Sequence, residues 1–261
     1  MDLTLWPLWL LGFLGSLVAG LATGLGALPI FFRKAWPAES TSLLLAVAGG
    51  IMLAASMFSL IVPALEIVAE RSTRTLAPAT VVGGGILLGA IAIWAVHTVV
   101  PHEHFEKDAS GHHFLALGRN WLFILAIALH NIPEGLSVGV AFGAGISSGL
   151  PIAVGIGIQN MPEGLAVAAA LISDGASRMR AFVVAVASGL LEPIGGLIGA
   201  IVVNYSDALL PWGLAFAAGA MLFVIVGEVI PEAYRDDRHH GPTMALLGGF
   251  LVMMVLDVTL G

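Results

Sequence analysis

Residues 5–32 read LWPLWLLGFLGSLVAGLATGLGALPIFF, a run of apolar and small residues without a single charged side chain. A bilayer crossing takes about 20 apolar residues in an α-helix but only about 10 in a barrel strand, and this run lacks the alternation of a strand. A cleavable secretory signal would begin with basic residues, and Met1-Asp2 carries no base. The run therefore predicts a first membrane helix.

The rest of the 261-residue chain has the same character. Hydrophobic residues make up 58% of it and charged residues 10%, with a mean hydropathy of +0.99, whereas soluble domains carry about 25% charged residues. So few charges cannot cover a water-facing surface, which excludes a soluble globular protein. We predict an all-α integral membrane protein with one transmembrane domain over residues 1–261 and eight transmembrane helices, near residues 6–32, 41–66, 76–100, 115–143, 149–173, 181–204, 208–231 and 242–260.

The positive charges predict the orientation of these helices. Eight of the ten bases lie in turns after the first, third, fifth and seventh helices: Arg33, Lys34, Lys107, Arg119, Arg178, Arg180, Arg235 and Arg238. Only Arg71 and Arg74 lie on the other side. Because cytoplasmic loops are enriched in Lys and Arg, both termini are expected outside. The absence of a transit-like start favours a bacterial inner membrane.

The longest polar segment, residues 102–118, is predicted to be a mobile cytoplasmic loop, because it has no apolar face to bury. It contains four histidines, which are His102, His104, His112 and His113. Two interpretations stay open. The loop is either a metal relay or sensor at the cytoplasmic exit, or a solvated segment that is merely rich in histidine.

The composition also excludes several kinds of chemistry and partner. The chain contains no cysteine, which excludes disulfides, thiolate zinc sites and iron–sulfur ligation. Its net charge of −7 argues against nucleic acid as a partner. The expected partner at this point is the lipid bilayer.

Several acids are predicted to lie deep within the membrane helices, while all ten bases lie in or beside turns. These acids are Glu134, Glu163, Glu192 and Glu228. An ionised carboxylate alone in hydrocarbon is unfavourable by several kcal/mol. Protonation, a water-filled cavity or a bound cation can each relieve this cost. Three or more such groups in one bundle, with no base at the same depth, favour a path for cations.

A repeated motif narrows the choice of cation. Residues 130–135 read HNIPEG and residues 159–164 read QNMPEG, on two predicted helices that are joined by one turn. In each motif the first and fifth residues share a helix face, and the proline releases the backbone carbonyl four residues earlier. Imidazole together with carboxylates suits Zn²⁺, Fe²⁺, Mn²⁺, Co²⁺ or Cd²⁺ better than Mg²⁺ or Ca²⁺.

The sequence also bears on functions other than a path for metal ions. An intramembrane metalloprotease would also place His and Glu on a helix, but the chain lacks the His-Glu-x-x-His pattern, so neither an enzyme nor a catalytic cofactor is expected. A proton- or sodium-coupled carrier of an organic substrate would need basic or aromatic anchors at depth. Among transport functions, a channel is an alternative to a carrier. A structural scaffold would leave the buried acids unexplained.

These motifs, on the fourth and fifth of eight helices, resemble those of the ZIP (Zrt-, Irt-like) divalent metal transporters, and the chain is most similar to the bacterial GufA-like subgroup. The resemblance extends over nearly the whole chain and includes residues 50–56, 188–193 and 227–232. It implies an eight-helix bundle in which helices 1–3 and 6–8 are inverted repeats around helices 4 and 5. It also implies that two copies often form a homodimer.

The resemblance further implies roles for individual residues. A first metal site would comprise His130, Glu134, Gln159 and Glu163, with Met52 close by. A second, adjacent site would be framed by Asn131, Asn160 and Glu192, with Glu134 and Glu163 bridging the two. Glu66 and Asp257 would lie at the entrance and Glu228 at the cytoplasmic exit. Many family members carry a histidine and an acid where this chain has Gln159 and Asn160. The second site is therefore expected to be weak, to take a monovalent ion or to stay empty.

The implied function is movement of a divalent transition metal into the cytoplasm, with zinc as the first choice and iron, manganese, cobalt or cadmium as others. The metal is a transported substrate. The 33 glycines would let helices approach closely and slide, which would permit alternating access. Tight packing alone explains the same glycines equally well. Metal binding needs neutral imidazole and ionised carboxylates, so acidification is expected to weaken uptake.

Overall fold

The structure is a computed structural model that describes residues 5–33, 38–99, 119–173, 175–235 and 240–260. All regular structure in these ranges is helical, which confirms the all-α prediction. The 3₁₀ segments are η2 and η5, and the π-helical segments are η3 and η6. In chain order the elements are α1 (Leu8–Ala27), η2 (Leu28–Phe31), α2 (Ala38–Ala54), η3 (Ala55–Ile61), α3 (Val62–Arg71), α4 (Ala77–Val99), α5 (Arg119–Ala144), α6 (Ile146–Ser173), α7 (Arg178–Gly189), α8 (Glu192–Tyr205), η5 (Asp207–Leu209), α9 (Leu210–Val224), η6 (Ile225–Val229), α10 (Ile230–Ala233) and α11 (Gly241–Leu260).

Six helical stretches within the described ranges are long and apolar enough to cross a membrane. They are Leu8–Phe31, Ser42–Arg71, Ala77–Val96, Arg178–Tyr205, Leu210–Ala233 and Gly241–Leu260. The two other long helices are α5 and α6, with 26 and 28 residues. At 1.5 Å per residue they are roughly 39 and 42 Å long, more than the ~30 Å hydrocarbon core of a bilayer. That α5 and α6 also cross, which would make eight spans, stays a prediction.

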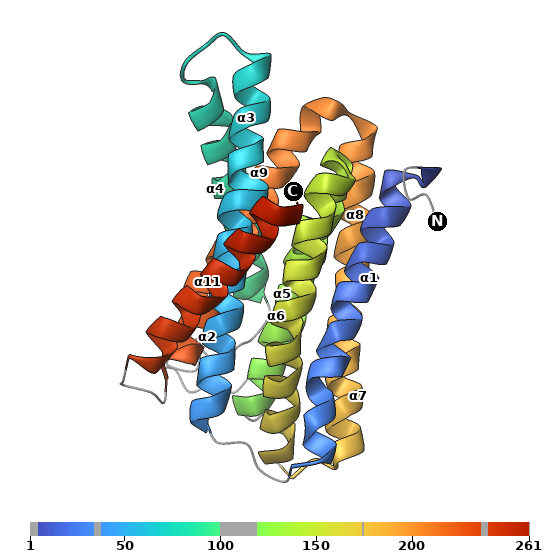
Figure 1. Ribbon diagram of the computed structural model, residues 1–261, viewed down its shortest axis with the longest axis vertical. Helices are drawn as coiled ribbons and strands as arrows, with labels where there is room; N and C mark the ends of the chain where they lie inside the picture. Colours follow the sequence, from blue (N-terminus) through green and yellow to red (C-terminus); the bar gives the residue numbers. More distant parts are fainter. Residues whose placement is uncertain (1–4, 34–37, 100–118, 174, 236–239, 261) are drawn as a thin grey trace.

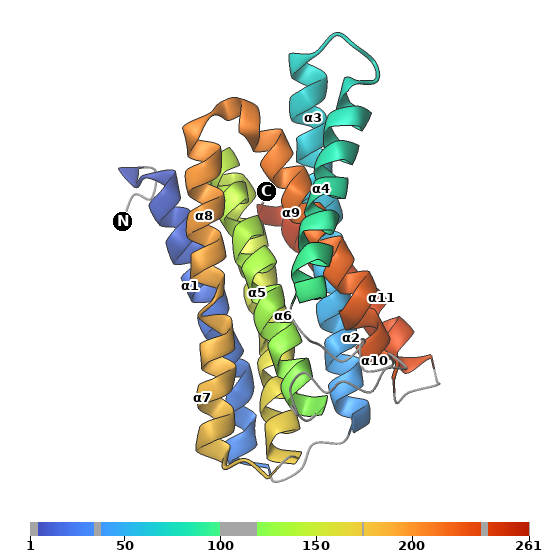
Figure 2. The ribbon, with the colours of Figure 1, turned by 180° about the vertical axis from the view of Figure 1, so that it is seen from behind.

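The helices form two groups that lie side by side (Figures 1 and 2). The first helix group consists of α1, α5, α6, α7 and α8, in which α1 packs on α6 and α8, and α5 packs on α8. The second helix group consists of α2 to α4 and α9 to α11 with their π-helical segments; α2 packs on α11 and α4 on α9. The groups meet where α6 contacts α2 and α5 contacts α9.

A single residue, Gly145, connects α5 to α6. Its φ of 137° lies in a region that favours glycine, because a side chain would clash there. The chain reverses at this point, and α5 and α6 pack against each other as neighbours (Figure 1). The two Pro-Glu-Gly motifs are therefore on adjacent helices, as the sequence predicts.

The helix predicted over residues 181–204 is interrupted in the structure. α7 ends at Gly189 and α8 begins at Glu192, with Leu190 and Leu191 between them. Pro193 follows Glu192 in the first turn of α8, where proline lacks only an N–H that has no helical partner. Hydropathy alone treats the two pieces as one span, so the sequence interpretation missed the break.

Two other predicted helices contain π-helical segments that the sequence interpretation also missed. η3 lies within the predicted helix 41–66, and η6 within the predicted helix 208–231. In each case a proline occupies the second position of the α-helix that follows, Pro63 in α3 and Pro231 in α10. Such segments within α-helices are frequent at functional sites.

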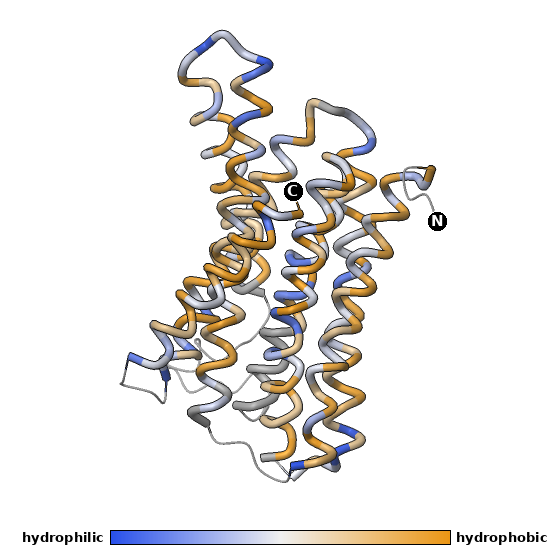
Figure 3. The backbone as a smooth tube through the Cα atoms, viewed as in Figure 1, coloured by the Kyte–Doolittle hydropathy of each residue, from blue (hydrophilic) through white to orange (hydrophobic). Residues whose placement is uncertain are grey.

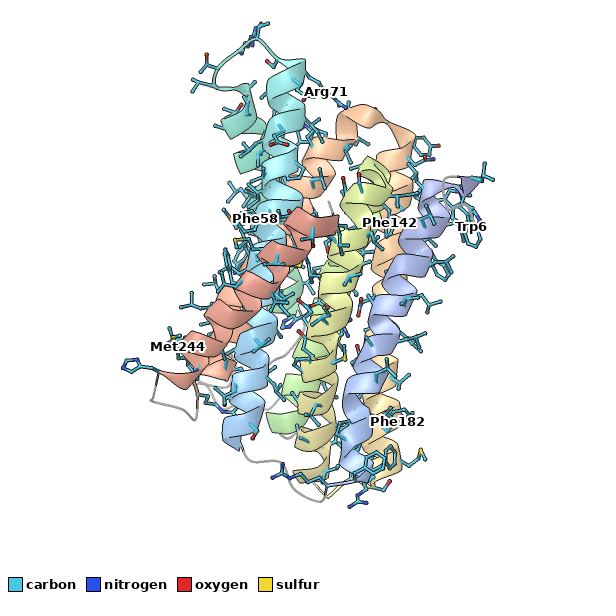
Figure 4. The ribbon with its side chains drawn as sticks, viewed as in Figure 1. Trp6, Phe58, Arg71, Phe142, Phe182 and Met244 are labelled. Atoms are coloured by element: carbon cyan, nitrogen blue, oxygen red, sulfur yellow. The ribbon has the colours of Figure 1, made fainter. Side chains whose placement is uncertain are left out.

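The outer helices of the bundle are mostly hydrophobic along their length, and hydrophilic positions lie at the ends of the bundle and partway along its central helices (Figure 3). α4 and α11 are the least buried of the six candidate spans. The apolar side chains that α4 exposes suit contact with lipid; they include Leu87, Leu88, Ile91 and Trp94. Figure 4 places Arg71 at one end of the bundle and Phe182 at the other. Which end faces the cytoplasm stays a prediction, and the histidines of residues 102–118 lie outside the described residues.

Candidate metal centre

The two Pro-Glu-Gly motifs lie in the interior of the bundle, where polar atoms gather between the helices (Figure 4). Each residue predicted for the two metal sites and the exit is at most 9% exposed: Met52, His130, Asn131, Glu134, Gln159, Asn160, Glu163, Glu192 and Glu228. Six of the nine come from α5 and α6, and the others come from α2, α8 and η6. The sequence has no Lys or Arg between residues 120 and 177, so no Lys or Arg lies within ten residues of either motif along the chain.

Two side-chain amides of α6 donate to carboxylates of neighbouring helices. Gln159 Nε2 donates to Glu134 Oε1 of α5 at 2.6 Å. Asn160 Nδ2 donates to Glu192 Oε1 of α8 at 2.6 Å, and also to the backbone carbonyl of Ala19 in α1 at 2.8 Å. Hydrogen bonds to ionised groups are shorter and stronger than neutral ones. The amides therefore hold Glu134 and Glu192 in the interior of the first helix group.

His130 is paired across the boundary between the two helix groups. Its Nε2 lies 3.0 Å from Oε2 of Glu228, and both side chains are largely shielded from solvent. Glu228 belongs to the π-helical segment η6, so the partner of this histidine lies 98 residues further along the chain. The sequence places His130 on the same helix face as Glu134, but the structure gives it Glu228 as its partner.

Several buried polar atoms in the same region have no hydrogen-bond partner within the described part of the chain. They are Oε2 of Glu134, Glu163 and Glu192, Oε1 of Gln159, Oδ1 of Asn160, both amide atoms of Asn131 and Oγ1 of Thr23. The carboxylate of Glu163 also lies close enough to those of Glu134 and Glu192 to repel them. Each unpaired buried polar atom costs about 1–3 kcal/mol. A cation surrounded by these oxygens would relieve both costs.

In this structure the side chains of the described residues are not arranged to bind a metal ion. Among them, no group of three or more His, Asp or Glu side chains is arranged so that it could hold a metal ion. The contacts give the reason, because His130 faces Glu228 while one oxygen of Glu134 and one of Glu192 accept from amides. Metal binding would require His130 to leave Glu228 and the Gln159 amide to turn its oxygen inward. The predicted ligand sets therefore stay predictions.

A cavity of about 250 Å³ opens near the predicted entrance. Glu66 of α3 and Asp257 of α11 line it together with Ser147 and Ser148 at the start of α6. Ser59 of η3 also lines the cavity, and its hydroxyl donates to Asp257 Oδ1. The structure thus brings the two predicted entrance acids to one cavity, and Figure 4 shows the neighbouring Phe58 on the same part of the bundle.

The sequence interpretation missed three polar groups that the structure brings to these sites: Ser59, Thr23 and the carbonyl of Ala19. Ser59 stands four residues before Pro63, a position at which proline disturbs helical hydrogen bonding, and this spacing could have marked it. The Ala19 carbonyl has no sequence signal, because its role depends on where α1 crosses α6. Thr23 lies one helical turn further along α1.

Comparison with known proteins defines the class of the chain. Residues 101–257, more than half of it, match the ZIP zinc transporter family. The zinc transporter GufA of Myxococcus xanthus is 44% identical over 251 residues, covering 96% of this chain and 99% of that protein. The zinc transporter ZIPB of Bordetella bronchiseptica is 43% identical over 259 residues, covering 95% and 81%.

A vertebrate relative shows the same relationship. The zinc transporter ZIP11 of Xenopus tropicalis is 33% identical over 328 residues, covering 95% of this chain and 96% of that protein. The chain therefore belongs to the ZIP family of integral membrane metal transporters, which confirms the family predicted from the paired motifs. The relatives are named as transporters, which also confirms the prediction that the chain is not an enzyme.

Proposed function

We propose that this chain imports divalent transition-metal ions, zinc before iron, manganese, cobalt and cadmium, through the centre between α5, α6 and α8. The observation that carries the proposal is the cluster of unpaired buried oxygens on Glu134, Glu163 and Glu192. The relatives of this chain are named as zinc transporters, so a transported divalent ion is the group that would coordinate these oxygens. The ligands of that ion would be His130, Glu134, Gln159 and Glu163, with the Met52 thioether near by.

The proposal includes a complete path. Metal would enter at the cavity lined by Glu66 and Asp257, where negative charge raises the local concentration of cations. At the centre the metal ion would lose its water ligands. It would bind the imidazole of His130, which would then no longer pair with Glu228. Glu228 would then accept the ion on its way to the cytoplasm, since it lies next to His130 on the second helix group.

The proposed membrane arrangement has eight spans with both termini outside, in a bacterial inner membrane, and two copies as a homodimer. Two observations support the repeats of helices 1–3 and 6–8. The second helix of each predicted repeat contains a π-helical segment, η3 or η6, and each segment is followed by a proline at the second position of the next helix.

Glycine contacts within each helix group support alternating access. In the first helix group, a Cβ added at Gly135 would lie 1.9 Å from the carbonyl oxygen of Glu192. In the second, a Cβ at Gly50 would lie 1.9 Å from the carbonyl oxygen of Leu246. Backbones this close leave no room for a side chain between them, and contacts of this kind would hold each group together as one body.

The glycines where the two groups meet have different neighbours. A Cβ at Gly155 of α6 would meet the side chain of Met253 in α11, and a Cβ at Gly213 of α9 would meet the side chains of Val140 and Val203. Side chains can change rotamer while backbone cannot, so this boundary is where the groups would slide. Since the proposed ligands except Met52 lie on the first group, sliding would carry the bound ion from one side of the membrane to the other.

The test is zinc flux into liposomes that hold the purified protein and a metal-sensitive dye. His130→Ala and Glu163→Ala should each abolish flux, because one removes the imidazole and the other a carboxylate. Glu232→Ala is the matched control, since Glu232 pairs with Arg235 near the surface at 2.8 Å and outside the centre. Unchanged zinc flux in either centre variant, at equal protein content, would refute the proposal.

A further inference from the structure

Gln159 and Asn160 are consecutive amide side chains, but the structure holds them differently. Gln159 Nε2 donates to Glu134 Oε1, and this is the one hydrogen bond of its side chain among the described residues. Asn160 Nδ2 donates twice, to Glu192 Oε1 at 2.6 Å and to the backbone carbonyl of Ala19 at 2.8 Å. Both hydrogens of the Asn160 amide are therefore in use.

This difference decides which amide can turn its oxygen toward a metal ion. If the Asn160 amide rotated by half a turn, its oxygen would face two acceptors, the Ala19 carbonyl and the Glu192 carboxylate, and both hydrogen bonds would become repulsive contacts. The Ala19 carbonyl belongs to the α1 backbone and cannot turn away. The Gln159 amide has no such backbone partner, and its rotation would expose to the metal the Oε1 atom that now has no partner within the described residues.

An amide NH₂ group has no lone pair to give a metal ion. It presents the positive end of the amide dipole instead, and Asn160 presents that end to Glu192. A cation next to Glu192 would have to occupy the same position as these hydrogens. The Asn160 amide therefore supplies to Glu192 the positive charge density that a second ion would otherwise supply.

On the basis of the proposed function, we infer that this centre holds one divalent ion and that Asn160 sets this number. The ion lies on the side of His130, Glu134, Gln159 and Glu163. Glu192 is held by the Asn160 amide rather than by a second ion, and its other oxygen is left to accept from water. Gln159 is the amide that changes its orientation when the ion arrives.

An aspartate at position 160 would reverse this situation. Its carboxylate would face Glu192 Oε1 and the Ala19 carbonyl, and three oxygens with negative charge or partial charge would then surround one point. Only a cation or a shared proton could join them, and a divalent ion neutralises both carboxylates whereas a proton neutralises one. The substitution Asn160→Asp should therefore create a second ion site, while Asn160→Ala removes the same hydrogen bonds without adding a ligand and is the matched control.

The experiment counts zinc. The purified full-length chain in lipid nanodiscs is stripped with a chelator, dialysed against Zn²⁺ and analysed for zinc per protein. We expect one ion for the wild type, two for Asn160→Asp and one for Asn160→Ala, with a lower melting temperature for Asn160→Ala because Glu192 and Ala19 lose their donor. Zinc should raise the melting temperature of Asn160→Asp more than that of the wild type.

Each outcome has a separate meaning. Two zinc ions in the wild type, or a folded Asn160→Asp variant with a single ion, would overturn the inference and leave the proposed function standing. No zinc in the wild type would overturn the proposed function and the inference with it. The wild-type count needs no substitution, so a misfolded Asn160→Asp variant would still leave the inference open to refutation.

Discussion

Gly164 and Gly155 allow a direct comparison of the contacts within and between the helix groups, because both lie in α6. A Cβ added at Gly164 would lie 1.9 Å from the backbone carbonyl oxygen of Thr23 in α1. A Cβ added at Gly155 would lie 2.3 Å from the sulfur of Met253 in α11. The first neighbour is backbone within the first helix group, and the second is the end of a flexible side chain across the boundary.

The expected free energies follow from these neighbours. Replacing glycine by alanine within a helix favours folding by about 0.8–1 kcal/mol at either position. At Gly164 the α1 backbone must retreat by about 1.5 Å to reach an ordinary contact. A gap of only about 0.5–1 Å already forfeits a quarter to a half of the dispersion energy of the atoms that face it. Overpacking typically costs about 1–3 kcal/mol. The gain in helix propensity cancels between the two variants, and a retreat this large favours the upper end of the overpacking range. Gly164→Ala should therefore be less stable than Gly155→Ala by about 3 kcal/mol.

Thermal unfolding in detergent, followed by the fluorescence of the six tryptophans, measures the difference. A free-energy change of 1 kcal/mol shifts the melting temperature by about 2–4 °C in a protein of this size, so the two variants should differ by roughly 6–12 °C. Gly155→Ala should keep its stability yet transport zinc more slowly, because its methyl group lies where the groups slide. Equal loss of stability in both variants would refute the division into two bodies.

Two further predictions address the exit and the orientation. Glu228→Gln should weaken the pairing of residue 228 with His130, since hydrogen bonds to charged groups are stronger than neutral ones by ~1.4 kcal/mol. Calorimetry should then show about tenfold tighter zinc binding, and vesicles should show slower zinc release. Weaker zinc binding would instead make Glu228 a ligand of the resting ion. The chain contains no cysteine, so a single cysteine placed at an exposed position reports which side of the membrane it faces. Thr73→Cys should react with a membrane-impermeant maleimide in intact cells, and Met179→Cys only after permeabilisation. The reverse pattern would invert the predicted orientation.

Hydropathy and motif spacing predict most of the fold and the burial of the residues of the centre. The helices begin and end near the predicted boundaries because burial of apolar residues dominates in this chain, and His130, Glu134 and Glu163 are buried as predicted. The π-helical segments and the break at Leu190–Leu191 escaped prediction, since a shift in the backbone hydrogen-bond pattern changes neither composition nor hydropathy.

The side-chain pairings escaped prediction for a different reason. Spacing along one helix shows which residues share a face, but it does not show which partner a neighbouring helix supplies. His130 faces Glu228 of η6, and Asn160 faces a backbone carbonyl of α1. Both pairings depend on how the helices cross, which one sequence without its fold does not specify.

The crossing of α1 connects the helix packing to the chemistry of the centre. A Cβ at Gly20 would lie 2.2 Å from the carbonyl oxygen of Gly189, and a Cβ at Gly189 would lie 2.2 Å from that of Gly20, so only glycine at both positions lets α1 approach α7 this closely. This approach holds the Ala19 carbonyl within 2.8 Å of Asn160 Nδ2. The interruption after Gly189 then starts α8 at Glu192, which accepts the other hydrogen of the same amide. The orientation of Asn160, and with it the number of ions proposed for the centre, is therefore a consequence of backbone packing rather than of ligand identity alone.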